Sequence, residues 1–206
     1  MIEKRVEYGI RHFLEGGFFL EQDQFYCLEE KAESGRSELQ LEVNGDNLCS
    51  EDYDHKGKCN FLRDGEFKLK RSVDHVVLQK KDEKWILHLI EMKSKVDNKK
   101  WYEIKQKIRA SYFNMKALES VLGIHIDEIK TYTTYEDTWF SRPSGSADPK
   151  MFAAPLGKPT LPTPQMDWDG GQITVDIGEI VQFPHLAVLM KRTEDGEKLV
   201  GKLSIS

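Results

Sequence analysis

Three charged residues, Asp74, Glu91 and Lys93, lie at the ends of two apolar segments. Residues 71–79 and 85–93 are joined by a short polar run, a pattern that predicts a β-hairpin. A turn centred on that run places Asp74 opposite Glu91. Because side chains alternate between the two faces of a strand, Glu91 and Lys93 share a face. The sequence therefore predicts two carboxylates and one ammonium group close together at one end of the hairpin.

Charges in such a place are costly unless a metal ion or a substrate binds them. Two carboxylates at neighbouring strand ends can hold Mg²⁺, a hard cation that prefers oxygen ligands. The ion polarises a phosphoryl oxygen and lowers the pKa of a bound water. A neighbouring lysine can orient or deprotonate that water, or stabilise the charge of the transition state. The three residues thus predict cleavage of phosphodiester bonds. Mutual repulsion of the carboxylates also predicts that removing Asp74 can stabilise the fold.

Asp74, a spacer of sixteen residues and the run Glu91-Met92-Lys93 resemble the core motif of the PD-(D/E)XK nuclease superfamily. The order of the expected elements over roughly residues 1–140 agrees with this family: a helix, the hairpin, a long helix and a further strand. The resemblance implies an α/β fold with a restriction-endonuclease-like core, in which helices flank a central mixed β-sheet. It also implies that Asp74, Glu91 and the Met92 backbone carbonyl bind Mg²⁺ or Mn²⁺, with Lys93 as the catalytic lysine.

The chain departs from the family pattern in two respects. Val73 stands where the motif's name has proline, a position at which the family varies. Many members also contribute a glutamate from the first helix. For this additional metal ligand Glu7 is the first choice, followed by Glu3 and Glu38.

Two alternatives stay open beside a DNA-cleaving enzyme. Charged residues at strand ends commonly form the solvated rim of a sheet, and a surface ion pair contributes under about 1 kcal/mol. The chain can also be a catalytically silent protein of the same fold that binds nucleic acid or a protein partner. Its net charge of −5 favours the silent protein, as does the unassigned upstream glutamate.

A basic segment follows the hairpin and indicates where nucleic acid binds. Between residues 93 and 116 there are eight basic and only two acidic residues, with aromatic residues interleaved. A positive track that begins at the cleavage centre suits a phosphate backbone. The alternative is a solvated helix face. The expected phosphate contacts are Lys95, Lys99, Lys100, Lys105 and Arg109.

Composition limits the class of protein. The 206 residues suffice for one sizeable core. Three cysteines argue against a disulfide framework and indicate a reducing compartment. No apolar run approaches the length of a membrane span, and the first residues lack a signal-peptide core. We therefore expect a cytoplasmic protein with no membrane partner.

Hydrophobic periodicity and turn residues divide the chain into three parts. Residues 1–140 form the expected nuclease-like core, 141–165 a connection rich in proline and glycine, and 166–206 a β-rich extension packed on the core. This extension can lengthen the sheet, cover one of its edges or form a homodimer contact. The expected helices are 2–14 and 99–122, and the expected strands outside the hairpin are 18–28, 37–43, 129–135, 172–177, 186–190 and 198–205.

The polar stretch 48–65 is expected to be a loop over the active site. It contains Cys49, His55 and Cys59, whose side chains are suitable zinc ligands. It lacks a paired Cys-x-x-Cys motif and an obvious fourth ligand, however, which argues against a zinc site.

Overall fold

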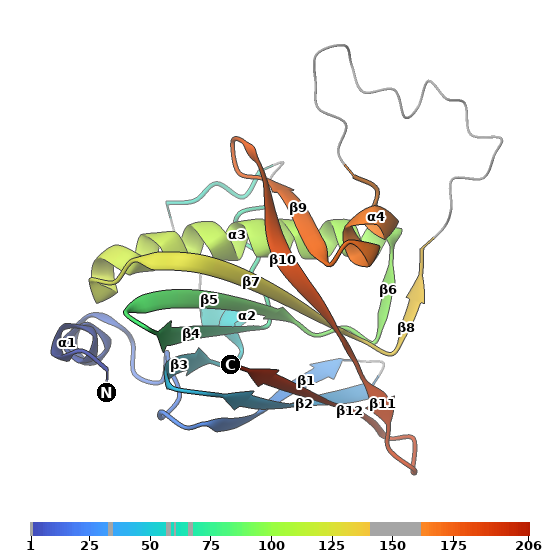
Figure 1. The fold of residues 1–206 in the computed structure, drawn as a ribbon, viewed down its shortest axis with the longest axis horizontal. Helices are drawn as coiled ribbons and strands as arrows, with labels where there is room; N and C mark the ends of the chain where they lie inside the picture. Colours follow the sequence, from blue (N-terminus) through green and yellow to red (C-terminus); the bar gives the residue numbers. More distant parts are fainter. Residues whose placement is uncertain (1, 33–34, 57–58, 60, 66–67, 141–161) are drawn as a thin grey trace.

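The computed structural model describes residues 2–32, 35–56, 59, 61–65, 68–140 and 162–206 (Figure 1). The helices are α1 (Lys4–Phe13), α2 (Tyr53–Lys56), α3 (Asn98–Leu122) and α4 (Pro164–Asp169). The strands are β1 (Phe25–Ala32), β2 (Gly35–Val43), β3 (Asp46–Ser50), β4 (His75–Lys81), β5 (Lys84–Glu91), β6 (Lys95–Asp97), β7 (Ile126–Tyr135), β8 (Asp137–Trp139), β9 (Gln172–Asp176), β10 (Ile180–Leu189), β11 (Lys191–Arg192) and β12 (Lys198–Ile205).

Strands β4 and β5 form the predicted hairpin in the predicted register. The antiparallel pairing extends from Lys81 opposite Lys84 to His75 opposite Ile90. Asp82 and Glu83 make the two-residue turn, and both have positive φ, at 50° and 60°. This backbone is typical of the tight hairpin turn that matches the twist of the strands. The register brings the ends of the two strands together, as the charged residues require.

A mixed six-stranded sheet lies at the centre of the molecule, in the order β3-β4-β5-β7-β10-β9. The chain leaves β5, passes through β6 and α3, and returns as β7, which pairs in parallel with β5. Successive residues of β4 point to opposite faces of the sheet. Val76 packs in a hydrophobic core beneath α3, and Val77 packs in a second core on the opposite face. Helix α3 therefore covers one face of the central sheet.

The second sheet, β1-β2-β12-β11, packs on the opposite face (Figure 1). Strand β12 pairs in parallel with β2 along its whole length, and β10 pairs in parallel with β7. The C-terminal strands are therefore members of both sheets, joined to the expected core by backbone hydrogen bonds, and not a layer added outside it. Of the expected connection 141–165, residues 141–161 lie outside the described part of the chain.

Most of the expected elements have counterparts in the structure. Three segments differ: the strand expected at 18–28 begins only at Phe25, the strand expected at 186–190 begins already at Ile180, and the stretch 48–65 includes the end of β3 and helix α2. Phe18 and Phe19 instead pack edge to face, with ring centroids 5.0 Å apart, in the segment that precedes β1. In the described residues no helix is long and apolar enough to cross a membrane.

Helix α3 is held at both ends and at its middle. Asp97 accepts a hydrogen bond from the Lys100 N–H at 2.7 Å, which caps the first turn. Gly123 ends the helix with a positive φ of 70°. In the middle, the hydroxyl of buried Ser111 accepts a hydrogen bond of 2.9 Å from the Val73 N–H. The last bond fixes the segment immediately before Asp74 against the helix.

A buried carboxylate joins α4 to α3 and β9. Asp167 is fully buried and accepts a hydrogen bond of 2.8 Å from the Thr174 hydroxyl. It also contacts the ammonium group of Lys105 and, at 3.4 Å, the indole N–H of Trp101. Removal of the carboxylate leaves the largely shielded ammonium group of Lys105 and the buried indole N–H of Trp101 without this acceptor.

We expect Asp167→Ala to lower the free energy of unfolding by about 3 kcal/mol, because it leaves a shielded ammonium group unpaired. Urea denaturation measures this loss. Asp169→Ala in the same helix is the matched control, since Asp169 is exposed. Equal stability of the two variants would contradict a structural role for Asp167.

Candidate functional site

The structure brings Asp74, Glu91 and Lys93 together where the central hairpin ends. Asp74 immediately precedes β4 and Glu91 is the last residue of β5. Both carboxylates are buried, with 3% and 0% of the residue surface exposed. Along the chain, Asp74 and Glu91 alternate with residues that pack against the second sheet. Their side chains therefore lie on the opposite face, which α3 covers.

Lys93 contacts both carboxylates and a backbone oxygen. Its Nζ lies 2.6 Å from Glu91 Oε1 and 3.6 Å from Asp74 Oδ2. The same ammonium group donates a hydrogen bond of 2.7 Å to the Met92 carbonyl. All three of the expected metal-ligating residues therefore surround one lysine.

The backbone around Lys93 is fixed by its neighbours. Asp74 Oδ2 accepts a hydrogen bond of 2.6 Å from the Met92 N–H. On β7, the Thr134 hydroxyl accepts one from the Lys93 N–H at 2.9 Å and donates one to the Lys93 carbonyl at 3.1 Å. These bonds fix the backbone just after it leaves the sheet, and they therefore fix the position from which the side chain of Lys93 extends.

A second lysine, Lys107 of α3, completes the cluster. Its Nζ is 2.9 Å from Asp74 Oδ1 and 2.7 Å from Glu91 Oε1. From the sequence, Lys107 is expected only as one of the basic residues that follow the hairpin. Its position between Ile104 and Ser111, three residues after one and four before the other, is a signal for this placement, because such residues share a helix face.

Burial and charge affect the two carboxylates differently. Burial alone would raise the pKa of Asp74, but the charges of Lys93 and Lys107 outweigh it and hold that pKa below its ordinary value. Burial, and after it the negative charge of Asp74, raises the pKa of Glu91 to about 7. Burial would lower the pKa values of both lysines, but contact with Glu91 and Asp74 raises them. The lysines are therefore held in the charged form.

The oxygen atoms of the cluster suit a hard divalent cation. Two carboxylates and the Met92 carbonyl are the donor types that Mg²⁺ takes. The second carboxylate oxygen of Glu91, Oε2, is buried and has no hydrogen-bond partner among the described residues. A buried acceptor of this kind is costly unless a ligand fills its position. The site thus fits the metal that the motif implies.

A third carboxylate, Glu30 of β1, is half-buried and interacts electrostatically with Asp74, Lys93 and Lys107. It follows Tyr26 and Leu28 at alternate positions, and both of those residues are buried against the central sheet. Burial, and after it the negative charge of Asp74, raises the pKa of Glu30. The alternation of Tyr26, Leu28 and Glu30 in the sequence indicates that Glu30 lies on the side of β1 that faces the central sheet.

The structure does not bring Glu7, Glu3 or Glu38 to Asp74. Glu7 is exposed on α1, and Glu3 bonds Lys80 at 2.8 Å, next to the hairpin turn. The turn lies at the opposite end of β4 from Asp74, and a strand of this length separates the two places by roughly 20 Å. Glu38 pairs with Lys198 in the second sheet. First-helix residues therefore cannot supply the additional ligand in this arrangement.

The residues expected to contact phosphate fall into two groups. Lys95 and Lys99 are exposed just beyond the cluster. Lys100 is paired with Glu103 at 3.0 Å, and Lys105 is paired with buried Asp167. The guanidinium of Arg109 donates to the Asp176 carbonyl at 3.3 Å. The structure thus presents Lys95 and Lys99 to solvent, whereas Lys105 has a structural partner.

The possible zinc ligands are not gathered at one point. Cys49 is buried in β3, His55 is exposed beside Asp54, and Cys59 is half-buried, and the three are not among the described groups whose ligand atoms lie close enough to share an ion. In the described part of the chain, one other group has suitable spacing for a metal: Cys27, Glu29 and Glu38. Its two carboxylates already contact Arg36 and Lys198, so this group gives no support for a metal.

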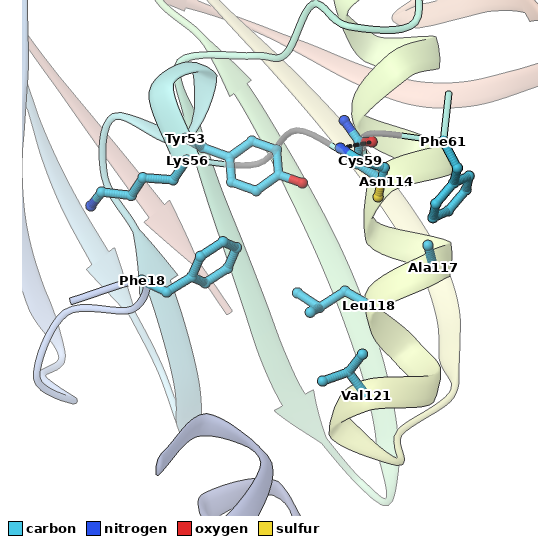
Figure 2. A pocket seen from close by; sticks show the side chains of 9 residues that line it. All are labelled: Phe18, Tyr53, Lys56, Cys59, Phe61, Asn114, Ala117, Leu118 and Val121. Atoms are coloured by element: carbon cyan, nitrogen blue, oxygen red, sulfur yellow. Dashed lines mark hydrogen bonds between the residues drawn. The ribbon is translucent and has the colours of Figure 1, made fainter. Parts of the chain in front are cut away.

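A separate cavity of about 240 Å³ lies between α2 and the second half of α3 (Figure 2). Figure 2 shows Phe18, Tyr53 and Leu118 pointing into it, and the Cys59 N–H donates to Asn114 at 3.3 Å. Its described lining is mainly apolar and includes no carboxylate. The cavity therefore lacks the groups that the predicted chemistry needs.

Comparison of the sequence with protein-family models and with curated proteins, and comparison with solved structures, found no match. Inferences about function therefore depend on the geometry of the cluster formed by Asp74, Glu91, Lys93 and Lys107.

The structure reverses the expected effect of removing Asp74. Two ammonium groups and a backbone N–H bind this carboxylate, so attraction outweighs the repulsion between the carboxylates. We expect Asp74→Asn to lower the free energy of unfolding by about 3 kcal/mol at pH 7. Because the pKa of Asp74 is lowered on folding, this contribution is present above about pH 4 and disappears as the pH falls through the folded-state pKa.

Urea denaturation between pH 7 and pH 3, with exposed Asp137→Asn as the control, measures this effect. A deficit that stays constant over that range, or a gain in stability at pH 7, would contradict the ion-pair account.

Proposed function

We propose that the protein is a metal-dependent nuclease that hydrolyses phosphodiester bonds, with DNA as the expected substrate, through a PD-(D/E)XK-type site. The supporting observation is the convergence of Asp74, Glu91 and Lys93 beside a buried Glu91 oxygen that lacks a hydrogen-bond partner in the described residues. The mixed central sheet with α3 on one face is compatible with a restriction-endonuclease-like core.

Each residue of the cluster has a distinct role in this proposal. Asp74, Glu91 and the Met92 carbonyl would hold Mg²⁺, and Glu30 would take the place of Glu7 as the additional acidic residue. When bound, the metal supplies positive charge for the developing charge on the phosphoryl group and acidifies water. Lys93 orients the attacking water or stabilises the transition-state charge. Burial of Asp74 and Glu91 excludes competing solvent from their oxygens.

A second function, a catalytically silent binding protein, is favoured by one observation. Lys107 and Lys93 already neutralise the two carboxylates without a metal. A cluster that is balanced in this way can be purely structural. The two functions differ in whether a divalent ion is needed, and incubation of the protein with plasmid and single-stranded substrates in Mg²⁺ or EDTA distinguishes them.

We expect Lys93→Ala to abolish cleavage while nearly preserving nucleic-acid affinity, because the lysine acts in the transition state. Cleavage in Mg²⁺ or Mn²⁺ and fluorescence anisotropy with a labelled duplex in EDTA give the two readouts. Lys84→Ala, an exposed change at the far end of the same hairpin, is the control. Cleavage by Lys93→Ala at the wild-type rate would refute the assigned role.

The basic track is tested by the salt dependence of binding. We expect the double change Lys95→Gln and Lys99→Gln to reduce the slope of log K against log salt by about two, since each lost phosphate contact removes about one unit. Lys84→Gln with Lys202→Gln removes the same charge elsewhere on the surface. If both double variants show the wild-type slope, Lys95 and Lys99 are solvated residues and nucleic acid binds another surface.

A further inference from the structure

The ammonium group of Lys107 lies where the two proposed metal-ligating side chains meet. It contacts Asp74 Oδ1 at 2.9 Å and Glu91 Oε1 at 2.7 Å. This cation comes from α3, whereas Lys93 belongs to the short segment that follows β5. The carboxylates are therefore already bridged by a positive charge in the free protein.

The third proposed metal ligand, the Met92 carbonyl, also has an ammonium group bound to it. The Met92 carbonyl accepts a hydrogen bond from Lys93 Nζ, which also contacts Glu91. Two ammonium groups thus balance two carboxylates. A divalent ion that entered with both ammonium groups in place would give the cluster an excess of positive charge at short distances, which is unfavourable in a poorly solvated site. Metal binding therefore requires one lysine to leave.

Lys107 is the lysine that can leave. The backbone of Lys93 is bound on both sides by Thr134, and its side chain returns to the carbonyl of the preceding residue. Lys107 instead extends from a helix, and its side chain, which is exposed as much as that of Lys93 (22% against 23%), is held at its end by ion pairs with the two carboxylates. Its long flexible stem can turn towards solvent without moving α3. Glu91 Oε2, which has no hydrogen-bond partner in the described chain, then lies ready for an ion.

We propose that Lys107 is a displaceable counter-ion, which keeps the metal site closed until a phosphate group of the nucleic acid binds it. This inference rests on the proposed function. A phosphate outside the carboxylates attracts the ammonium group by a charge-assisted hydrogen bond. The two carboxylates are then free to hold Mg²⁺. Metal and nucleic acid consequently strengthen each other's binding, because coupling between two ligands is reciprocal.

Calorimetric titration with Mg²⁺ tests the first part in the absence of nucleic acid. We expect Lys107→Met to bind Mg²⁺ at least about tenfold more tightly than the wild type, because the competing charge is gone. Lys107→Arg keeps the charge and should bind weakly, like the wild type. Lys116→Met is the control on the same helix, since Lys116 pairs with Glu119 at 2.6 Å, away from the site.

The coupling itself is measured on the unaltered protein, so it does not depend on how well a variant folds. Fluorescence anisotropy with a labelled DNA duplex is recorded in EDTA and in Ca²⁺, which takes the same oxygen ligands. We expect Ca²⁺ to tighten DNA binding by the wild type, and by Lys116→Met to the same extent. Lys107→Met should show a clearly smaller effect of Ca²⁺.

Failure of the role of Lys107, failure of the coupling and failure of the proposed function give different results. Equal Mg²⁺ affinity of the wild type and Lys107→Met, with Mg²⁺-dependent cleavage by the wild type, overturns the role of Lys107 and leaves the nuclease intact. If the wild type cleaves but Ca²⁺ does not change its affinity for DNA, the coupling is overturned. Absence of both Mg²⁺ binding and cleavage in the wild type and in Lys107→Met overturns the proposed function as well.

Discussion

Two buried carboxylates at the end of an apolar hairpin need positive partners, and this need connects the central sheet to α3. Asp74 and Glu91 lie close together because the register of the hairpin places them opposite each other. Their repulsion is offset by Lys93, which follows β5, and by Lys107, which comes from the crossover helix. The hydrogen bond from Val73 to Ser111 keeps helix and strand in the relative position that these contacts require. Helix packing and charge balance therefore stabilise the same arrangement.

The parts of the structure that depend on local patterns could be predicted from the sequence. The turn at Asp82 and Glu83 sets the register, and the register places Asp74 beside Glu91. The long helix could be predicted from its apolar stripe and from the glycine that ends it. Lys107 required one more step, because its role depends on how α3 is rotated over the hairpin. That rotation follows from packing between residues far apart in the sequence.

The contribution of the first and last strands was harder to predict for the same reason. Strand β12 joins β2, and the two are separated by most of the chain. No turn between them sets the pairing, so composition alone suggested an extension. The contribution of Glu30 could not be predicted, because Glu30 interacts with Asp74 only when the second sheet packs on the first. Glu7 was preferred on the family pattern, and the structure instead places it on the exposed surface of α1.

The central claim is that the oxygens of Asp74 and Glu91 form a divalent-metal site. It is tested most directly by crystals grown with Mn²⁺ and measured at a wavelength where manganese scatters anomalously. The account predicts one strong anomalous peak within about 2.3 Å of an oxygen of each carboxylate, with Lys107 Nζ moved away from both. A map from Mn²⁺-saturated crystals with no peak there, and with Lys107 still bridging the carboxylates, would contradict it.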